Sequence, residues 1–321
     1  MHAPLIAGLF LNCALAAFPA AAQQYPAQPI RLIAPAPPGS PVDIRARWVA
    51  EQLAPLGQPV LVDNRAGAGG NVGAELAARS RPDGYTLVVV HQGIVAFNPH
   101  LYVRTGFDPL KDFAPVTRIV DTYLLLMVPA ASPVDSLSKL IHAARERPGA
   151  MSYGSSGNGT PPHLAAELFR RLSGIEALHV PYKGATPSLT DLLAGRVDFS
   201  FDSAASHGAH VKAGKLRALA VTARARLATF PDVPTMEEAG LPGYEYGSWI
   251  GLLAPAGTPE EIVGRINAQL VKAIRSPAAR EWFAAQGGVP VGDSPEEFAA
   301  HIRAENSKWG KLIREAGIKA E

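Results

Sequence analysis

The stretch that decides the fold is residues 151–184, MSYGSSGNGTPPHLAAELFRRLSGIEALHVPYKG. It predicts a short strand, a loop without bulky side chains, a helix, and a second strand that ends in another loop. Thr160 is a typical N-cap residue, Pro161 suits the first helical position, and Gly174 is placed to end the helix. This order of elements indicates the α/β class.

The glycine-rich loop before this helix is the first candidate binding site. Its glycines allow the backbone to turn and to approach a guest closely. Hydroxyl and amide groups accompany them, and the candidate residues are Ser155, Ser156, Asn158, Gly159 and Thr160. Unpaired N–H groups at a helix start, together with the helix dipole, favour a carboxylate or another anion. Loops of this composition also form capped surface turns, so the loop alone leaves both interpretations open.

A second stretch of the same design lies at residues 30–53, IRLIAPAPPGSPVDIRARWVAEQL. An apolar strand runs into a loop of proline and glycine, and Ser40 is placed to cap the following helix. The candidate site residues here are Pro38, Gly39, Ser40 and Asp43. For Asp43 we favour the capping role, because a carboxylate would repel an anionic guest. The backbone N–H groups of this loop are therefore the better candidates for ligand contacts.

Further candidates stand at strand ends or in the first turn of a helix. His91 and Gln92 follow the strand TLVVV, and ligands of open α/β sheets bind beyond the carboxyl ends of the strands. A solvated strand end is the alternative for both residues. His163 lies in the first turn of the helix after the glycine loop, where it bonds backbone or contacts ligand. Lys183 and Asp202 follow two other strands, and they either pair with each other or contact the guest.

The patterns for cofactors and metals are incomplete. The loop GAGGNVG follows a strand, but Val72 stands where the dinucleotide fingerprint G-x-G-x-x-G requires its last glycine. We therefore expect a capped turn and no cofactor. His207 and His210 have an i, i+3 spacing that could serve a metal ion, yet no third ligand or cysteine pair accompanies them. No metal site is expected.

An exported serine hydrolase is the alternative function. Residues 154–158, GSSGN, approach the nucleophile elbow G-x-S-x-G, with Ser156 or Ser155 as the nucleophile. The final glycine of that pattern is replaced by Asn158. Neither His163 nor His179 is marked by a motif as the general base, so we expect a protein that is not an enzyme.

Composition and the first residues indicate an exported globular protein. The chain has 321 residues, a formal net charge of +2 and 47% hydrophobic residues, values that argue against disorder and against nucleic-acid binding. Residues 1–22 are almost wholly apolar and end in small residues, as in a cleaved signal peptide, although no Lys or Arg precedes Arg31. A retained membrane anchor is the alternative. Because the single cysteine, Cys13, lies in this segment, the mature chain needs a core that is stable without disulfides.

The chain carries, in order, the blocks PPGSPVDIRAR, NRAGAGGNVGAE, RPDGYTLVV, NPHLY, DPLKDFAPV, GSSGNGTPPHLAAELF, HVPYKGATPSLTDLLAGRVDFSFD, KAGKLRALAVT, PDVPTMEEAGLPGYE and GLLAPAGTP. This succession closely resembles the tripartite tricarboxylate transporter receptor family, also called the Bug receptors. The resemblance spans nearly all of the mature chain. It implies a periplasmic solute-binding protein of the two-lobe type II (Venus flytrap) fold, α/β, with a mixed sheet in each lobe and two crossing strands.

The resemblance also implies where a ligand binds. In this family the loops that correspond to residues 37–43 and 155–160 face each other across the cleft. They hold a carboxylate through backbone N–H groups, hydroxyls and ordered waters rather than through an arginine clamp. This chain departs from the family pattern at the cleft rim, where it has Ala36 and Ser40 in the first loop and His91-Gln92 after the third strand. The pair His91-Gln92 could suit an aromatic or a more polar acid.

Two apolar runs, residues 123–128 and 249–255, are the expected crossings between lobes. We therefore expect a first lobe of residues 23–124 plus 250–321 and a second lobe of residues 125–249. The predicted function is a monomeric periplasmic receptor without catalytic activity. It would bind one small organic acid between closing lobes and present the acid to membrane transporter subunits or to a sensing partner.

Overall fold

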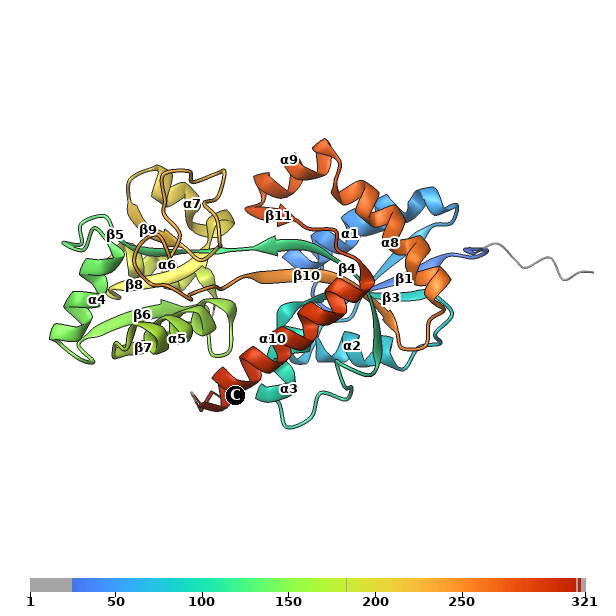
Figure 1. The fold of residues 1–321 in the computed structure, drawn as a ribbon, viewed down its shortest axis with the longest axis horizontal. Coiled ribbons are helices and arrows are strands. Elements are labelled where there is room, and N and C mark those ends of the chain that lie inside the picture. Colours follow the sequence, from blue (N-terminus) through green and yellow to red (C-terminus); the bar gives the residue numbers. More distant parts are fainter. Residues whose placement is uncertain (1–24, 183, 316, 319–321) are drawn as a thin grey trace, which may run out of the picture.

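The computed structural model describes residues 25–182, 184–315 and 317–318. The expected signal peptide, residues 1–22, and the site candidate Lys183 lie outside these ranges. The molecule is elongated and has two lobes side by side along its longest axis, each built on one β-sheet with helices packed on it (Figure 1). The predicted α/β fold with two lobes is confirmed.

The first lobe contains a six-stranded sheet in the order β11-β4-β10-β3-β1-β2. Its strands are β1 (Ile30–Ala34), β2 (Val60–Asn64), β3 (Thr86–His91), β4 (Phe113–Thr122), β10 (Ser248–Pro255) and β11 (Gly288–Pro290). Strand β1 is parallel to β2 and β3, whereas β10 is antiparallel to β3 and β4, and β11 is antiparallel to β4. The sheet is therefore mixed.

Helices and short helical turns accompany this sheet. They are α1 (Pro41–Leu53), η1 (Ala54–Leu56), η2 (Ala68–Gly70), α2 (Asn71–Ala78), η3 (Gly93–Phe97), α3 (Asn98–Leu101), α8 (Glu260–Ile274) and α9 (Pro277–Ala285). Apolar side chains of β1 alternate between two core clusters: Leu32 packs with the α1 side and Ile33 with the α2 side. Because both faces of the sheet are covered, its strands are apolar on both sides.

The second lobe contains a five-stranded mixed sheet in the order β7-β6-β8-β5-β9. Its strands are β5 (Leu124–Pro129), β6 (Met151–Ser155), β7 (Ala177–Pro181), β8 (Phe199–Ser203) and β9 (Leu216–Val221). Strand β6 is parallel to β7 and β8, and β5 is antiparallel to β8 and β9. The helices are α4 (Leu137–Glu146), α5 (Pro161–Ser173), α6 (Ala185–Leu193) and α7 (Ala204–Lys212). Thr160 stands at the N-cap position of α5 and Gly174 ends the helix in a left-handed conformation, as predicted, but the Thr160 side chain makes no capping hydrogen bond and donates instead to the Gly157 carbonyl (2.6 Å).

Two strands cross between the lobes, as expected. Only Tyr123 separates β4 in the first sheet from β5 in the second, and β10 leads the chain back from the second lobe. The last helix, α10 (Pro295–Glu315), runs diagonally from one lobe to the other (Figure 1). Its Phe298 packs in a core of the first lobe, whereas its Trp309 packs in the core of the second. Helix α10 thus contacts both lobes, and the lobe boundaries given above stay a prediction.

Candidate functional site

The candidate site is a cavity of about 650 Å³ between the lobes. Four segments of the first lobe line it: the loop after β1, the loop after β2, the end of β3, and the η3–α3 segment. The loop before α5 lines it from the second lobe. The lining residues are Pro35, Ala36, Pro37, Ala66, Gly67, Ala68, Gly69, Gly70, His91, Gly93, Phe97, Asn98, Leu101, Tyr102, Asn158, Gly159, Thr160 and Pro161. The two loops that the sequence singled out therefore border one cavity.

The loop after β1 contributes residues 35–37 to the lining, whereas Pro38, Gly39, Ser40 and Asp43 are not part of it. Asp43 is buried and fixes the helix start. Its carboxylate accepts hydrogen bonds from Gly39 N (2.8 Å), from Arg47 Nε (3.0 Å) and from Asn64 Nδ2 (2.9 Å). Burial alone would raise the pKa of Asp43, but these hydrogen bonds outweigh it and lower the pKa.

Three backbone N–H groups around the start of α1 already have partners within the loop. Gly39 N donates to Asp43, Ser40 N donates to the Pro37 carbonyl (3.2 Å), and Asp43 N donates to Ser40 Oγ (3.2 Å). Pro41 has no N–H group. We expected unpaired N–H groups here, and for these residues that expectation is wrong, because the cap residues satisfy the helix start themselves.

In the loop before α5, several backbone N–H groups also have partners within the loop. Gly157 N donates to Ser155 Oγ (3.2 Å), Gly159 N to His163 Nδ1 (3.0 Å), and Thr160 N to the Gly157 carbonyl (3.3 Å). The first two helical residues are prolines and lack N–H groups. The part of this loop that borders the cavity consists of Asn158, Gly159, Thr160 and Pro161.

Two stacked histidine side chains, those of His163 and His179, support the loop before α5. The rings of His163 and His179 lie 4.0 Å apart at an angle of 8°, and His179 also stacks on Tyr153 at 4.8 Å. Burial lowers the pKa of His163. Burial, followed by the neighbouring His163, lowers the pKa of His179 to about 4. Both rings are therefore neutral at neutral pH, and His163 holds the loop through Gly159 rather than lining the cavity.

Ser155 and His179 form a serine–histidine pair, with Oγ and Nε2 2.7 Å apart. A nucleophilic serine must reach its substrate. Ser155 is only 1% exposed, however, and it lies beneath the loop outside the cavity lining. Ser156 is half-buried and is also not a lining residue. The pair therefore serves the structure of the loop.

His91 ends β3 and Gln92 begins the helical segment after it, and the two side chains have different surroundings. His91 borders the cavity, and its Nδ1 accepts a hydrogen bond from Gly93 N (3.1 Å). Burial lowers the pKa of His91 to about 4, although a hydrogen bond with the Gly69 backbone acts in the other direction. Gln92 is fully buried outside the lining, and its Nε2 donates to a carboxylate oxygen of Glu305 in α10. Only His91 is placed to meet a ligand.

Asp202 does not border the cavity either. Its Oδ1 accepts hydrogen bonds from Ser203 N (2.7 Å) and Ser206 Oγ (2.7 Å), and it lies 3.7 Å from His207 Nδ1. Because these contacts organise the start of α7, Asp202 has a structural partner set of its own. Its pairing with Lys183 falls outside the described residues.

Sequence reasoning missed two parts of the lining. One is the loop at residues 66–70, which we expected only as a capped turn. Its Gly69 has φ +64°, and a Cβ there would lie 3.0 Å from the hydroxyl of Tyr102, so glycine allows the close approach. The other is the η3–α3 segment with Asn98 and Tyr102. Asn98 Nδ2 donates to the Gly69 carbonyl (3.1 Å) and ties the two parts together.

The lining is uncharged. Among its described residues there is no Asp, Glu, Lys or Arg, and His91 is neutral. Binding of an anion here must therefore use dipoles and hydrogen-bond donors, as the family resemblance implies.

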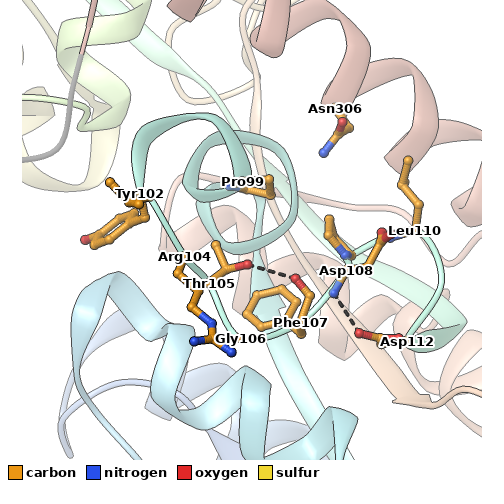
Figure 2. A pocket seen from close by; sticks show the side chains of 12 residues that line it. Pro99, Tyr102, Arg104, Thr105, Gly106, Phe107, Asp108, Leu110, Asp112 and Asn306 are labelled. Atoms are coloured by element: carbon orange, nitrogen blue, oxygen red, sulfur yellow. Dashed lines mark hydrogen bonds between the residues drawn. The ribbon is translucent and has the colours of Figure 1, made fainter.

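A second cavity, of about 610 Å³, lies beyond Tyr102 (Figure 2). It is lined by the loop after α3, which includes Arg104 and Asp108, and by Asn306 of α10. No described residue of β5–β9 or α4–α7 lines it. Movement of the second lobe's sheet would therefore not enclose a ligand there.

The described ranges contain no group of three His, Cys, Asp or Glu side chains that could hold a metal ion. None of their helices has both the length and the apolar character that crossing a bilayer requires.

Comparisons with known proteins agree with this architecture. The model of the tripartite tricarboxylate transporter family receptor matches residues 45–318. Protein BugT of Bordetella pertussis is 38% identical over 316 residues, which cover 98% of this chain and 97% of BugT.

Two solved structures extend the likeness. Rpa4515 of R. palustris with adipate has a TM-score of 0.77 and 38% identity, covering 92% of this chain and 99% of that one. MatC of Rhodopseudomonas palustris with bound malate has a TM-score of 0.72 and 32% identity, covering 90% and 100%. The chain therefore belongs to the tripartite tricarboxylate transporter receptor family, the Bug receptors, whose members are periplasmic solute-binding proteins.

Proposed function

We propose that this receptor captures a small organic carboxylate in the cavity between its lobes and presents it to a tripartite-type transporter or to a sensing partner. The observation that carries the proposal is the cavity itself, because it is lined by loops of both lobes and by uncharged polar groups. The related proteins of known structure contain adipate and malate. The chemistry shared by those two guests is the carboxylate.

The ligand contacts are assigned to the residues that border the cavity. From the candidates predicted by sequence these are His91, Asn158, Gly159 and Thr160, to which the structure adds Tyr102. Closure of the lobes would remove water, and in a medium of low dielectric a few hydroxyl and amide donors interact strongly with a negative charge. A hydrogen bond to a charged group is worth about 1.5–3 kcal/mol. A few such bonds replace an arginine clamp.

The remaining candidates support the loops. Ser40 and Asp43 hold the start of α1, and Ser155 and His163 hold the loop before α5. The α1 and α5 termini then act through their dipoles and through bound water. Pro38, Gly39, Ser156, Gln92 and Asp202 have no direct ligand contact in this assignment.

The proposal includes an absence of catalysis. The described residues form two serine–histidine pairs, Ser155 with His179 and Ser206 with His207. Neither serine borders the cavity, and Ser155 is in addition buried. We further propose that a cleaved N-terminal signal exports the protein, that it acts as a monomer, and that residues 23–124 plus 250–321 and residues 125–249 form the moving lobes.

Calorimetric titration with a panel of carboxylates tests the proposal. At least one acid should bind without turnover and raise the melting temperature, since a ligand present at 100 times its Kd stabilises the folded state by about 2.7 kcal/mol. Thr160→Val removes a hydroxyl that borders the cavity and donates to the Gly157 carbonyl (2.6 Å), and loss of this hydrogen bond in the loop should weaken binding about tenfold or more. The matched variant Thr229→Val changes a half-buried threonine elsewhere and should leave Kd unchanged. If no acid binds, or if Thr160→Val has no effect on Kd, the assignment fails.

A further inference from the structure

The wall of the cavity is largely apolar and aromatic. The side chains of this kind are Pro35, Ala36, Pro37, Ala66, Phe97, Leu101 and Tyr102. Leu101 reaches across the gap to the second lobe, because a Cβ at Gly159 would lie only 3.0 Å from its Cδ1. A guest between these surfaces therefore contacts hydrocarbon on the side of α3.

The polar groups on the first-lobe side of the cavity are largely engaged. Asn98 Nδ2 donates to the Gly69 carbonyl and to Asn71 Oδ1 (2.7 Å), and His91 Nδ1 accepts from Gly93 N. A second carboxylate placed on this side would lie against apolar side chains and would find the Asn98 amide and His91 Nδ1 already engaged. Burial of an unpaired charge is strongly unfavourable. This side suits an uncharged, apolar part of the guest.

Tyr102 marks where that part lies. It borders both cavities, and Figure 2 shows its ring directed away from Phe107 and Asp108, which line the second one. The Tyr102 hydroxyl lies close to Gly69, and the neutral imidazole of His91 borders the same cavity. An aromatic ring and a neutral imidazole offer flat, polarisable surfaces, and aromatic pairs favour offset or edge contacts with a planar guest.

We propose that the acid bound by this receptor is an aromatic monocarboxylate whose ring packs against Tyr102, Leu101 and His91 and whose carboxylate faces the Asn158–Thr160 loop. This inference rests on the proposed function and adds the class of ligand. It also gives His91 a physical role, because the residue borders the cavity as a neutral imidazole and offers the guest no charge.

The test is titration with benzoate, with its saturated analogue cyclohexanecarboxylate, and with adipate and malate. Benzoate should bind at least about tenfold more tightly than each of the other three. Tyr102→Ala should weaken benzoate binding about tenfold and abolish its advantage over the saturated ring, whereas Tyr102→Phe should retain that advantage. Val103→Ala alters the adjacent, fully exposed residue, which does not border this cavity, and should leave every Kd unchanged.

The outcomes separate this inference from the proposed function. If adipate or malate binds tightly and benzoate does not, the aromatic class is wrong while the receptor function stands. Equal affinity for benzoate and its saturated analogue, unchanged by Tyr102→Ala, likewise overturns the role of the aromatic wall. If no acid in any wider panel binds, the proposed function itself fails.

Discussion

Among the residues of α10, Trp309 should contribute most to the packing of this helix between the two lobes. It is fully buried, its ring lies 5.2 Å from those of Phe97 and Tyr246 in edge-on contacts, and its Nε1 donates to Glu305 Oε2 (2.8 Å). Phe97 also borders the candidate cavity. The change Trp309→Ala therefore opens a void beneath the cavity wall, where the first lobe meets the core of the second.

The expected loss follows from this packing. Truncation of a buried Trp or Phe to alanine costs about 3–5 kcal/mol, and each edge-on aromatic pair contributes about 0.5–1.5 kcal/mol beyond the buried area. We expect Trp309→Ala to lower the free energy of unfolding by about 4 kcal/mol, measured by urea denaturation followed by circular dichroism. Lys311→Ala, at an exposed position of the same helix, should change it by less than about 0.5 kcal/mol. A loss below about 1 kcal/mol for Trp309→Ala would refute the argument that α10 joins the two cores.

Two further perturbations concern the supports of the cavity. Asp43→Ala removes a buried carboxylate with three hydrogen bonds and should lower the free energy of unfolding by about 2–3 kcal/mol. Arg47→Ala removes only the exposed partner and should cost less than about 1 kcal/mol; equal losses would contradict the capping role. The folded state holds the pKa of His179 at about 4, below the unfolded value of 6.5. The contribution of this residue to the free energy of unfolding should therefore be constant above pH 7 and fall as the pH decreases from about 6.5 to 4. Allowing for partial exposure, the loss from this residue at pH 5 is about 1 kcal/mol. The urea midpoint should therefore depend less on pH in His179→Gln than in the parent protein. The exposed-site control His142→Gln should keep the pH dependence of the parent protein. Equal pH profiles for His179→Gln and the parent protein would refute this.

The sequence predicted the fold well where local signals agree with the topology. Thr160, the two prolines after it and Gly174 define α5 through local backbone chemistry alone, and such signals need no information from distant residues. The pattern of apolar residues likewise predicts the strands that cross between lobes. What it could not reveal is that α10 packs on both cores, because spacing shows which face of a helix is buried and not what covers it.

The site was predicted less well, for a reason visible at His91 and Gln92. His91 is the last residue of β3, whereas Gln92 has helical backbone angles (φ −45°, ψ −40°) and begins the helical segment that follows. The hydrogen-bond partner of Gln92 is Glu305, 213 positions further along the chain, so local sequence could not show which of the two residues borders the cavity. The availability of backbone N–H groups to a ligand also depends on the folded structure and not on local sequence alone. The sequence shows that Ser40 and Thr160 stand at helix starts, but whether neighbouring groups already use those donors is a property of the folded loops.

The most direct test of the central claim is a crystal structure of the receptor with the acid that binds most tightly in titration. We expect the acid to lie between the lobes, with its carboxylate near residues 158–160 and its body against Tyr102 and the loop at residues 66–70. Density for the acid in the cavity of Figure 2, or on any surface formed by one lobe alone, would contradict it.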